Sequence, residues 1–345
     1  KAAEVHVTER YKTSSSIGIN IEAEASVTRV QAAIVAGSEI DPNINYTEYV
    51  QKHSVCDAKG SYTLAFDFLK PESIYTVYVL AYDENGLPTG LKSLTCSTGA
   101  VADDPFTVKT THVGTTTLKY NVTAKDASVK YCTFATGYDY YQRWQLEEGT
   151  NGDVIKHFIS MWSTFASWYG ENWQTMMKYD RREGTYEGEG YHLMWDARQV
   201  VITFGMDDDG NLVTPIQVDS IHTNAPTPVD MDIPVTVLTN EWGDQQIKAA
   251  PTTNTPYFIT MQPAAYVDLY KTDAALLRAL CYEADNINPT DLARTRDEDL
   301  REGLWEFRVR KDVDTDYYII AVGLDEGAPA TRAFKTKITV PGGSF

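Results

Sequence analysis

Aromatic residues are concentrated in one part of the sequence, and their flat faces make it the best candidate for a binding surface. Five of the seven tryptophans lie between Tyr138 and Trp195. Large rings can stack on sugar rings or anchor a protein partner at low entropic cost. The polar segment RREGTYEGEGYH, residues 181–192, suits a mobile loop that hydrogen-bonds a polar ligand. The sequence thus predicts a ligand-binding surface formed by Trp168, Trp173, Trp144, Tyr141, Tyr140 and Arg181.

Two other interpretations of this region stay open. The rings could instead fill the junction between an inserted helix and a sheet, which is a structural role. The region could also be catalytic, because glycoside hydrolysis needs two carboxylates across a cleft. Five glutamates surround the aromatic residues: Glu147, Glu148, Glu171, Glu187 and Glu189. A chain with 48 acidic residues offers such pairs by chance, so we expect no catalytic residues.

No motif indicates a metal or a cofactor. The segment MDDDGNL, Met206 to Leu212, alternates oxygen ligands as a calcium loop does. It lacks the distant glutamate of an EF-hand, and its place between two strands favours a hairpin turn. The six histidines are scattered without metal-ligand spacing. We therefore expect no metal site and no cofactor.

Composition excludes some classes of partner. The net charge of −18 argues against nucleic acid, because there is no cationic surface to displace phosphate counterions. No run reaches the roughly 18 apolar residues of a membrane span, so we expect no transmembrane segment. The four cysteines show no metal spacing and no disulfide framework, although Cys56 and Cys96 fall in one predicted domain and could pair.

One hairpin pattern occurs three times, about 120 residues apart. Each copy has an alternating apolar run, an acidic turn with glycine, and a second run that contains Ser or Thr. The copies are YTVYVLAYDENGLPTG from Tyr75, QVVITFGMDDDGNLVT from Gln199 and YYIIAVGLDEGAPAT from Tyr317. Each is preceded by a middle strand and by an opening pair of strands, so the pattern predicts three antiparallel β-sandwiches in series.

Each unit resembles a fibronectin type III or immunoglobulin-like sandwich. The segment LKPESIYTVYVLAY matches the Leu-x-Pro-x-x-x-Tyr entry of that family, in which the tyrosine forms the tyrosine corner. Tyr75 and Tyr317 match this position, whereas Gln199 departs from it. Such tandem units with inserted helices resemble surface lipoproteins of gut Bacteroidota. This resemblance implies an exported protein with a lipid anchor upstream of Lys1, and it implies no catalytic residues.

The predicted domains are a sandwich at 1–103, a sandwich at 104–228 with a helical insertion at about 139–192, and a sandwich at 229–345 with an insertion at about 266–303. Residues 153–180 have one broad apolar face centred on Trp162, from which Trp168 is displaced, and Gly170 could break the helix. In the third domain, Thr272 or Asp273 is expected to cap a helix that buries Leu276, Leu277, Leu280 and Ala284. A further helix is predicted between Thr290 and Gly303.

These features predict a non-enzymatic binding or adhesion protein at the cell surface or outside the cell, which recognises a glycan or a protein partner through the aromatic insertion. One alternative is a structural spacer of a surface assembly, with no ligand of its own. A third is the glycan-acting enzyme considered above.

Overall fold

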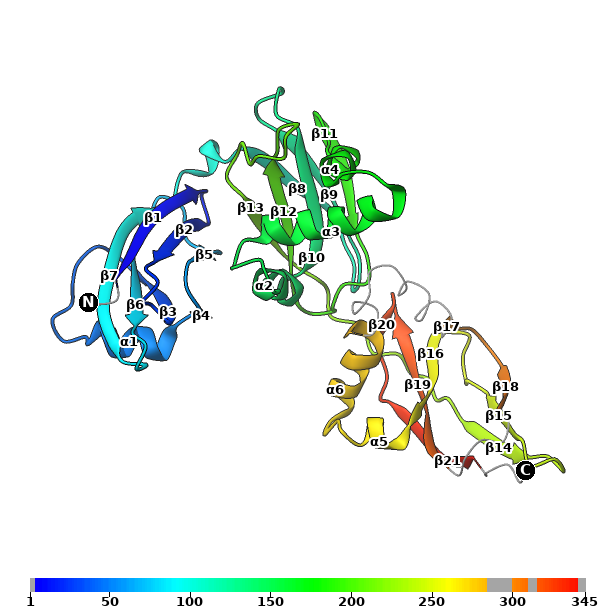
Figure 1. Cartoon of the computed structure of the whole chain (residues 1–345). Coiled ribbons are helices and arrows are strands. Elements are labelled where there is room, and N and C mark those ends of the chain that lie inside the picture. Colours follow the sequence, from blue (N-terminus) through cyan, green and yellow to red (C-terminus); the bar gives the residue numbers. More distant parts are fainter. Residues whose placement is uncertain (1–3, 284–299, 310–314, 341–345) are drawn as a thin grey trace. The chain divides into compact units, whose positions relative to one another are not determined.

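The chain folds into three antiparallel β-sandwiches, as the sequence predicts (Figure 1). The computed structural model describes residues 4–283, 300–309 and 315–340. By its internal contacts the chain divides into two compact units. The first contains Lys1–Thr111, Lys119–Glu189 and Gln199–Ile221, and the second contains His112–Leu118, Gly190–Arg198 and His222–Phe345.

The first sandwich packs a three-stranded sheet on a four-stranded sheet. The three-stranded sheet has the order β1-β2-β5, with bounds Val5–Lys12, Ile17–Ala23 and Tyr62–Phe66. The four-stranded sheet has the order β4-β3-β6-β7, with bounds Cys56–Ala58, Arg29–Ala36, Ile74–Tyr82 and Pro88–Ser97. Helix α1, Tyr46–His53, lies between β3 and β4 in the chain, and the short 3₁₀ helix η1 is Val101–Asp103.

The second sandwich has two three-stranded sheets. One has the order β8-β9-β11, with bounds Phe106–Val113, Leu118–Ala124 and Thr185–Gly190. The other has the order β10-β12-β13, with bounds Tyr131–Gly137, Arg198–Gly205 and Gln217–His222. Three helices separate β10 from β11 in the chain: α2 (Tyr138–Leu146), α3 (Val154–Tyr169) and α4 (Trp173–Asp180).

The third sandwich repeats the plan of the first. Its three-stranded sheet has the order β14-β15-β18, with bounds Val235–Thr239, Gln245–Ala249 and Trp305–Val309. In its other sheet β17-β16-β19-β21 are neighbours, with bounds Leu300–Arg301, Tyr257–Pro263, Thr315–Asp325 and Phe334–Val340, and β20 (Ala328–Pro329) also pairs with β19. Helices α5 (Ala264–Val267) and α6 (Asp273–Arg278) follow β16 and lead into the π-helix η2 (Ala279–Glu283).

This repeated strand order is that of a fibronectin type III-like sandwich, and the first copy has its tyrosine corner. The Tyr75 hydroxyl accepts a hydrogen bond from the backbone N–H of Lys70 at 3.0 Å. This bond ties the chain that crosses between the two sheets to the start of β6. The corresponding corner of Tyr317 involves residues outside the described ranges.

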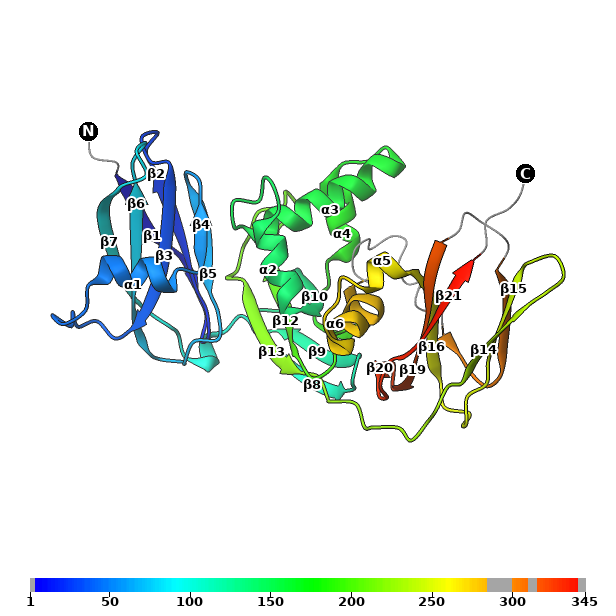
Figure 2. The ribbon, with the colours of Figure 1, turned by 90° about the horizontal axis from the view of Figure 1, so that it is seen from below.

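The first strand of each closing hairpin lies inside its sheet and is buried on both faces. The predicted alternation of apolar and polar residues is therefore wrong for these strands, which are β6, β12 and β19. Each contains a continuous run of buried residues. The sheet that contains each of these strands has one face in the sandwich core, and helices cover its other face (Figure 2). In the second sandwich, Val200, Ile202 and Phe204 of β12 pack against α3. Burial on both faces explains the unbroken apolar sequence of these strands.

Local sequence signals determine where these helices begin and end. The Asp153 carboxylate caps α3 by accepting from the N–H of Ile155, and Thr272 caps α6 by accepting from Ala275. Gly170 follows α3 with a φ of +69°, a left-handed conformation that favours glycine and ends the helix. Gly170 therefore divides the predicted 153–180 helix into α3 and α4.

Two features differ from the predicted helices. Helix α1 of the first sandwich was not predicted, although Asn45 caps it through bonds from Thr47 and Glu48 and is a recognisable signal. Gly303 follows strand β17 rather than a helix, so its predicted role as a helix terminator is wrong. Thr290 and Ala284 lie outside the described residues, whereas Leu276, Leu277 and Leu280 are buried as predicted.

We expect Tyr75→Phe to lower the free energy of unfolding by about 1 kcal/mol, because the Lys70 N–H loses its acceptor. Urea unfolding of the purified chain measures this change. Tyr169→Phe is the control, since Tyr169 is exposed. Equal stabilities of the two variants would show that the corner contributes nothing measurable.

All four cysteines are free and buried, including Cys56 and Cys96. Burial raises the thiol pKa of Cys56 to about 11 and that of Cys132 to about 12, which suppresses the reactive thiolate at neutral pH.

We expect a thiol-reactive dye to label the native chain very slowly. In guanidinium without reductant, it should titrate all four thiols. About two thiols under denaturing conditions would instead reveal a disulfide and contradict this assignment.

Candidate functional site

The aromatic insertion of the second sandwich is mainly a second hydrophobic core. Phe158 and Trp162 of α3 are buried against the outer face of β12 and β10. The rings of Phe134 and Phe158 stack with centroids 4.3 Å apart. The indole N–H of Trp162 donates to the Asp180 carboxylate at 2.6 Å and so joins α3 to the end of α4. The apolar face predicted around Trp162 is thus the face that covers the sheet.

Trp173 is wedged between α3 and the turn of the closing hairpin. Its ring lies parallel to that of Trp162, with centroids 6.3 Å apart. On the other side the turn passes so close that a Cβ on Gly210 would lie 2.0 Å from the Trp173 ring. Gly210 also has a φ of +88°. The MDDDGNL segment is therefore a turn, as predicted, and its glycine accommodates Trp173.

Tyr140 and Tyr141 belong to the core rather than to a surface. Tyr141 is 1% exposed, and Tyr140 is also buried. Burial, and next the charge of Asp67, raises the pKa of the Tyr141 hydroxyl. Neither ring presents a face to a ligand in this structure, so the prediction that these two tyrosines bind one has no geometric support.

Trp144 and Arg181 are also held by neighbours within the fold. Trp144 stacks on His157 with ring centroids 4.4 Å apart, and His157 Nδ1 lies 2.6 Å from a Glu147 carboxylate oxygen. Arg181 donates to the Met206 carbonyl at 3.0 Å and forms an ion pair with Asp208, whose pKa it holds below the usual value. Arg181 thus joins the end of α4 to the hairpin turn.

The segment 181–192 is not the loop predicted from its glycines. Its residues Thr185–Gly190 form strand β11 of the sandwich. Gly188 lies against Tyr120, because a Cβ there would be 2.4 Å from the tyrosine ring. The helical part of the insertion ends at Asp180, and the glycines of this segment serve strand packing.

One aromatic cluster remains exposed, at the end of α3. Trp168 is 58% exposed and Tyr169 is 72% exposed. Half-buried Phe165 supports Trp168 edge-on, with ring centroids 5.3 Å apart. Every residue from Ser167 to Asn172 is exposed, so the α3–α4 connection protrudes. We name Phe165, Trp168 and Tyr169 the helical tip. The sequence signal for it was the displacement of Trp168 from the apolar stripe.

The loop after α2 contacts the first sandwich inside the first compact unit, which the sequence did not indicate. The Thr63 N–H on β5 donates to the Asn151 carbonyl at 2.9 Å. Arg10 on β1 forms an ion pair with Asp153 at 3.1 Å. Between these contacts, a Cβ on Gly152 would lie 1.9 Å from the Thr63 carbonyl oxygen. Part of the insertion therefore joins two sandwiches.

The carboxylates considered for catalysis fall on three parts of the second sandwich: Glu147 and Glu148 follow α2, Glu171 lies between α3 and α4, and Glu187 and Glu189 lie on β11. Glu147 contacts His157, and Glu189 of β11 forms an ion pair with Lys119 at 2.9 Å. Within the described ranges, no group of three or more His, Cys, Asp or Glu side chains could hold a metal ion. Across the same residues, no helix is long and apolar enough to cross a membrane.

Comparisons with known proteins add little to this description. No protein-family model matches the chain, and no curated protein matches it. Similar solved structures include the central fibronectin-III array of RIM-binding protein (9% identity, TM-score 0.21, covering 74% of this chain and 82% of that one). Others are the chicken CNTN1 FN1–FN3 domains (12%, 0.21, 97% and 97%) and a Yersinia enterocolitica family 28 exopolygalacturonase (16%, 0.20, 29% and 20%). At these TM-scores the fold assignment depends on the strand pairing described above.

We expect Gly210→Ala to lower the free energy of unfolding by about 2–4 kcal/mol, since the new methyl group meets the Trp173 ring in addition to the backbone strain. Gly86→Ala is a matched control, because Gly86 occupies the hairpin turn of the first sandwich at a φ of +73° with open space around it. The control should show the strain alone, about 1 kcal/mol. Chemical denaturation of both variants measures the difference. Equal losses of stability would contradict the close packing of Trp173 against Gly210.

Proposed function

We propose that the chain is a non-enzymatic binding or adhesion protein that engages its partner through the helical tip. The observation that carries this proposal is the exposure of two large aromatic side chains, Trp168 and Tyr169, on a protruding helix end. Exposed tryptophan and tyrosine are typical anchors of interfaces, because they bring large contact area with few rotatable bonds.

The shape of the tip supports a protein partner rather than a glycan. Trp168 and Tyr169 lie on a protruding connection whose residues Ser167–Asn172 are all exposed. A protruding aromatic anchor fits a concave apolar pocket of the kind that proteins provide. The buried Tyr140 and Tyr141 add no groove or stacking platform for a sugar at this place.

We also propose that the protein works outside the cell, at a surface to which a lipid anchor upstream of this chain attaches it. The resemblance to tandem surface lipoproteins supports this location. The charge of −18 is consistent with a solvated, non-adsorbing surface protein. Protease accessibility on intact cells of the source organism would distinguish surface exposure from an internal location.

Site-specific photocrosslinking tests the proposed role of the helical tip. A photoreactive phenylalanine analogue replaces Tyr169 in one variant of the chain and Tyr179 in another, and both are expressed in the source organism. The two tyrosines are matched, since they are 72% and 73% exposed and lie near the ends of adjacent helices. We expect one discrete protein adduct at position 169, and we expect Trp168→Ala to abolish it.

Absence of an adduct at position 169, or an identical adduct pattern at position 179, would contradict the proposal. An adduct that disappears only when cell-surface glycans are enzymatically removed would assign the tip to a glycan instead.

A structural spacer is the second candidate, and the junction between the first two sandwiches favours it. The Arg10–Asp153 ion pair is mostly buried, and the Thr63–Asn151 hydrogen bond continues the edge of β5 into the insertion. Phe68 adds an edge-on contact with Tyr138, with ring centroids 5.0 Å apart. Such a junction stiffens two sandwiches into one body, which suits a spacer.

We expect Gly152→Ala to separate the unfolding of the first sandwich from that of the second. The alanine methyl would collide with Thr63, whereas Gly149→Ala in the same loop has open space at a similar φ of +84°. Calorimetry should show an additional transition for Gly152→Ala only. One unchanged transition for both variants would argue against a stiff junction.

A further inference from the structure

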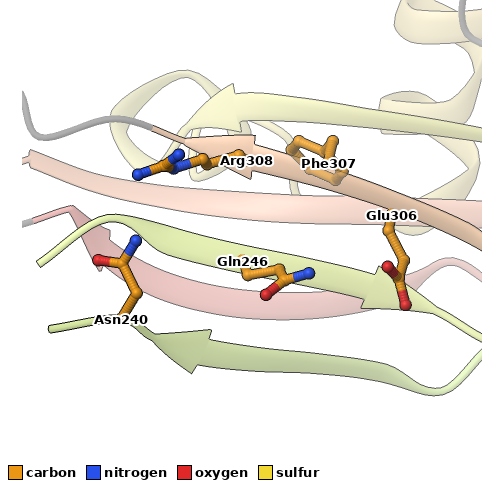
Figure 3. Close-up of a pocket in the computed structure, with 5 residues that line it drawn as sticks. All are labelled: Asn240, Gln246, Glu306, Phe307 and Arg308. Carbon is orange, nitrogen blue, oxygen red and sulfur yellow. The ribbon is translucent and has the colours of Figure 1, made fainter. Parts of the chain in front are cut away.

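The β8-β9-β11 sheet of the second sandwich and the β14-β15-β18 sheet of the third carry similar polar hollows, which we name the second and third hollows. The second hollow, of about 290 Å³, is lined by residues that include Thr111, Lys119, Asn121, Glu187 and Glu189. The third hollow, of about 330 Å³, is lined by Asn240, Gln246, Glu306, Phe307 and Arg308 (Figure 3). Each hollow lies within one compact unit.

The two hollows occupy the same place in the repeated fold. In the second sandwich, the lining comes from β8, β9 and β11, and in the third it comes from β15, β18 and the residue that follows β14. These sheets are β8-β9-β11 and β14-β15-β18, and among the described residues no helix packs on their outer faces. Asn121 and Gln246 both lie on the central strand of their sheet.

The corresponding sheet of the first sandwich contacts another segment of the chain. Asn20 of β2 stands at the position that Asn121 takes in the second sandwich, and its side chain contacts Thr63 of β5 at 3.3 Å. The loop after α2 contacts this sheet through Thr63 of β5 and Arg10 of β1. The repeat therefore has three equivalent faces, of which one binds a segment of this chain and two carry hollows.

Charge pairing in the hollows disfavours an anionic ligand. Lys119 forms an ion pair with Glu189 at 2.9 Å, and Arg308 forms one with Asp244. Glu306 of the third hollow also lies 3.5 Å from Lys248, which is outside the lining. Because each lining cation already has a carboxylate partner, an anionic group would have to displace that partner.

The remaining polar groups match a ligand that both donates and accepts hydrogen bonds. Gln246 and Asn121 present primary amides, which offer two donors and one acceptor oxygen. The Asn240 oxygen accepts from the N–H groups of Trp242 and Asp244, so its orientation is fixed and its NH₂ group is available to a ligand. Sugar hydroxyls act in both directions, so a neutral sugar can pair with these amides. The Phe307 ring itself packs against the sandwich core beside Trp305.

We propose that the second and third hollows are two equivalent subsites for a neutral polysaccharide, each holding a short segment of the polymer. A shallow polar site binds one segment weakly, but two sites on one chain raise the overall affinity for a polymer that repeats the same sugar. This site is separate from the helical tip, so the two proposals fail independently.

Affinity gel electrophoresis of the full chain tests this proposal. The probes are the neutral polysaccharides galactomannan, xyloglucan, mixed-linkage β-glucan and dextran, with polygalacturonate as the anionic comparison. We expect retardation by at least one neutral polymer, little effect of added salt, and none by polygalacturonate. Asn121→Ala or Gln246→Ala should each weaken binding about fivefold, the effect of one hydrogen bond. The double variant should lose detectable retardation.

Asn20→Ala is the matched control, because it changes the equivalent position in the first sandwich, and Trp168→Ala controls for the helical tip. Both should migrate like the unchanged chain. Circular dichroism confirms that each variant is folded. No retardation by any neutral polymer, or full retardation of the folded double variant, would overturn the proposal. Loss of binding in Trp168→Ala alone would also overturn it and would move the glycan site to the tip.

Discussion

The first strand of each closing hairpin lies inside its sheet and is apolar on both faces. The rest of the structure depends on keeping both of these faces out of water. Packing two sheets together covers one face of β6, β12 or β19. The other face carries residues such as Ile202 and Ile320, and each would cost about 1.5–3 kcal/mol if it stayed in water. In all three sandwiches the chain meets this demand in the same way, with helices that follow the middle strand.

The same constraint explains why most of the aromatic insertion is unavailable to a ligand. The outer face of β10 and β12 requires large side chains to cover it, and Phe158, Trp162 and Trp173 provide them. The loop after α2 is also unavailable, because Asp153 and Asn151 contact the first sandwich. What remains exposed is the end of α3, where Gly170 ends the helix and Trp168 and Tyr169 lie in solvent.

The sequence predicted the parts of the fold that depend on local signals. The three hairpins, the caps Asp153 and Thr272 and the corner of Tyr75 all follow from short patterns. It did not predict which aromatic residues are buried, because a tyrosine such as Tyr141 has the same local pattern whether a sheet or water faces it. The contact between Arg10 and Asp153 joins residues 143 positions apart, and no local pattern encodes it. The polar hollows were missed because residues such as Gln246 are ordinary in an exposed strand.

Paired substitutions within α3, read by hydrogen exchange, test most directly whether the helical layer is needed to cover the first strand of the closing hairpin. Phe158 is buried against β12, whereas Phe165, two turns further along the same helix, belongs to the helical tip and contacts Trp168. We expect Phe158→Ser to lower the free energy of unfolding by about 3–5 kcal/mol and to speed amide exchange in β12. Phe165→Ser should cost about 1 kcal/mol or less and leave β12 protected. Equal, small losses with unchanged β12 protection would show that the sandwich does not depend on its helical layer.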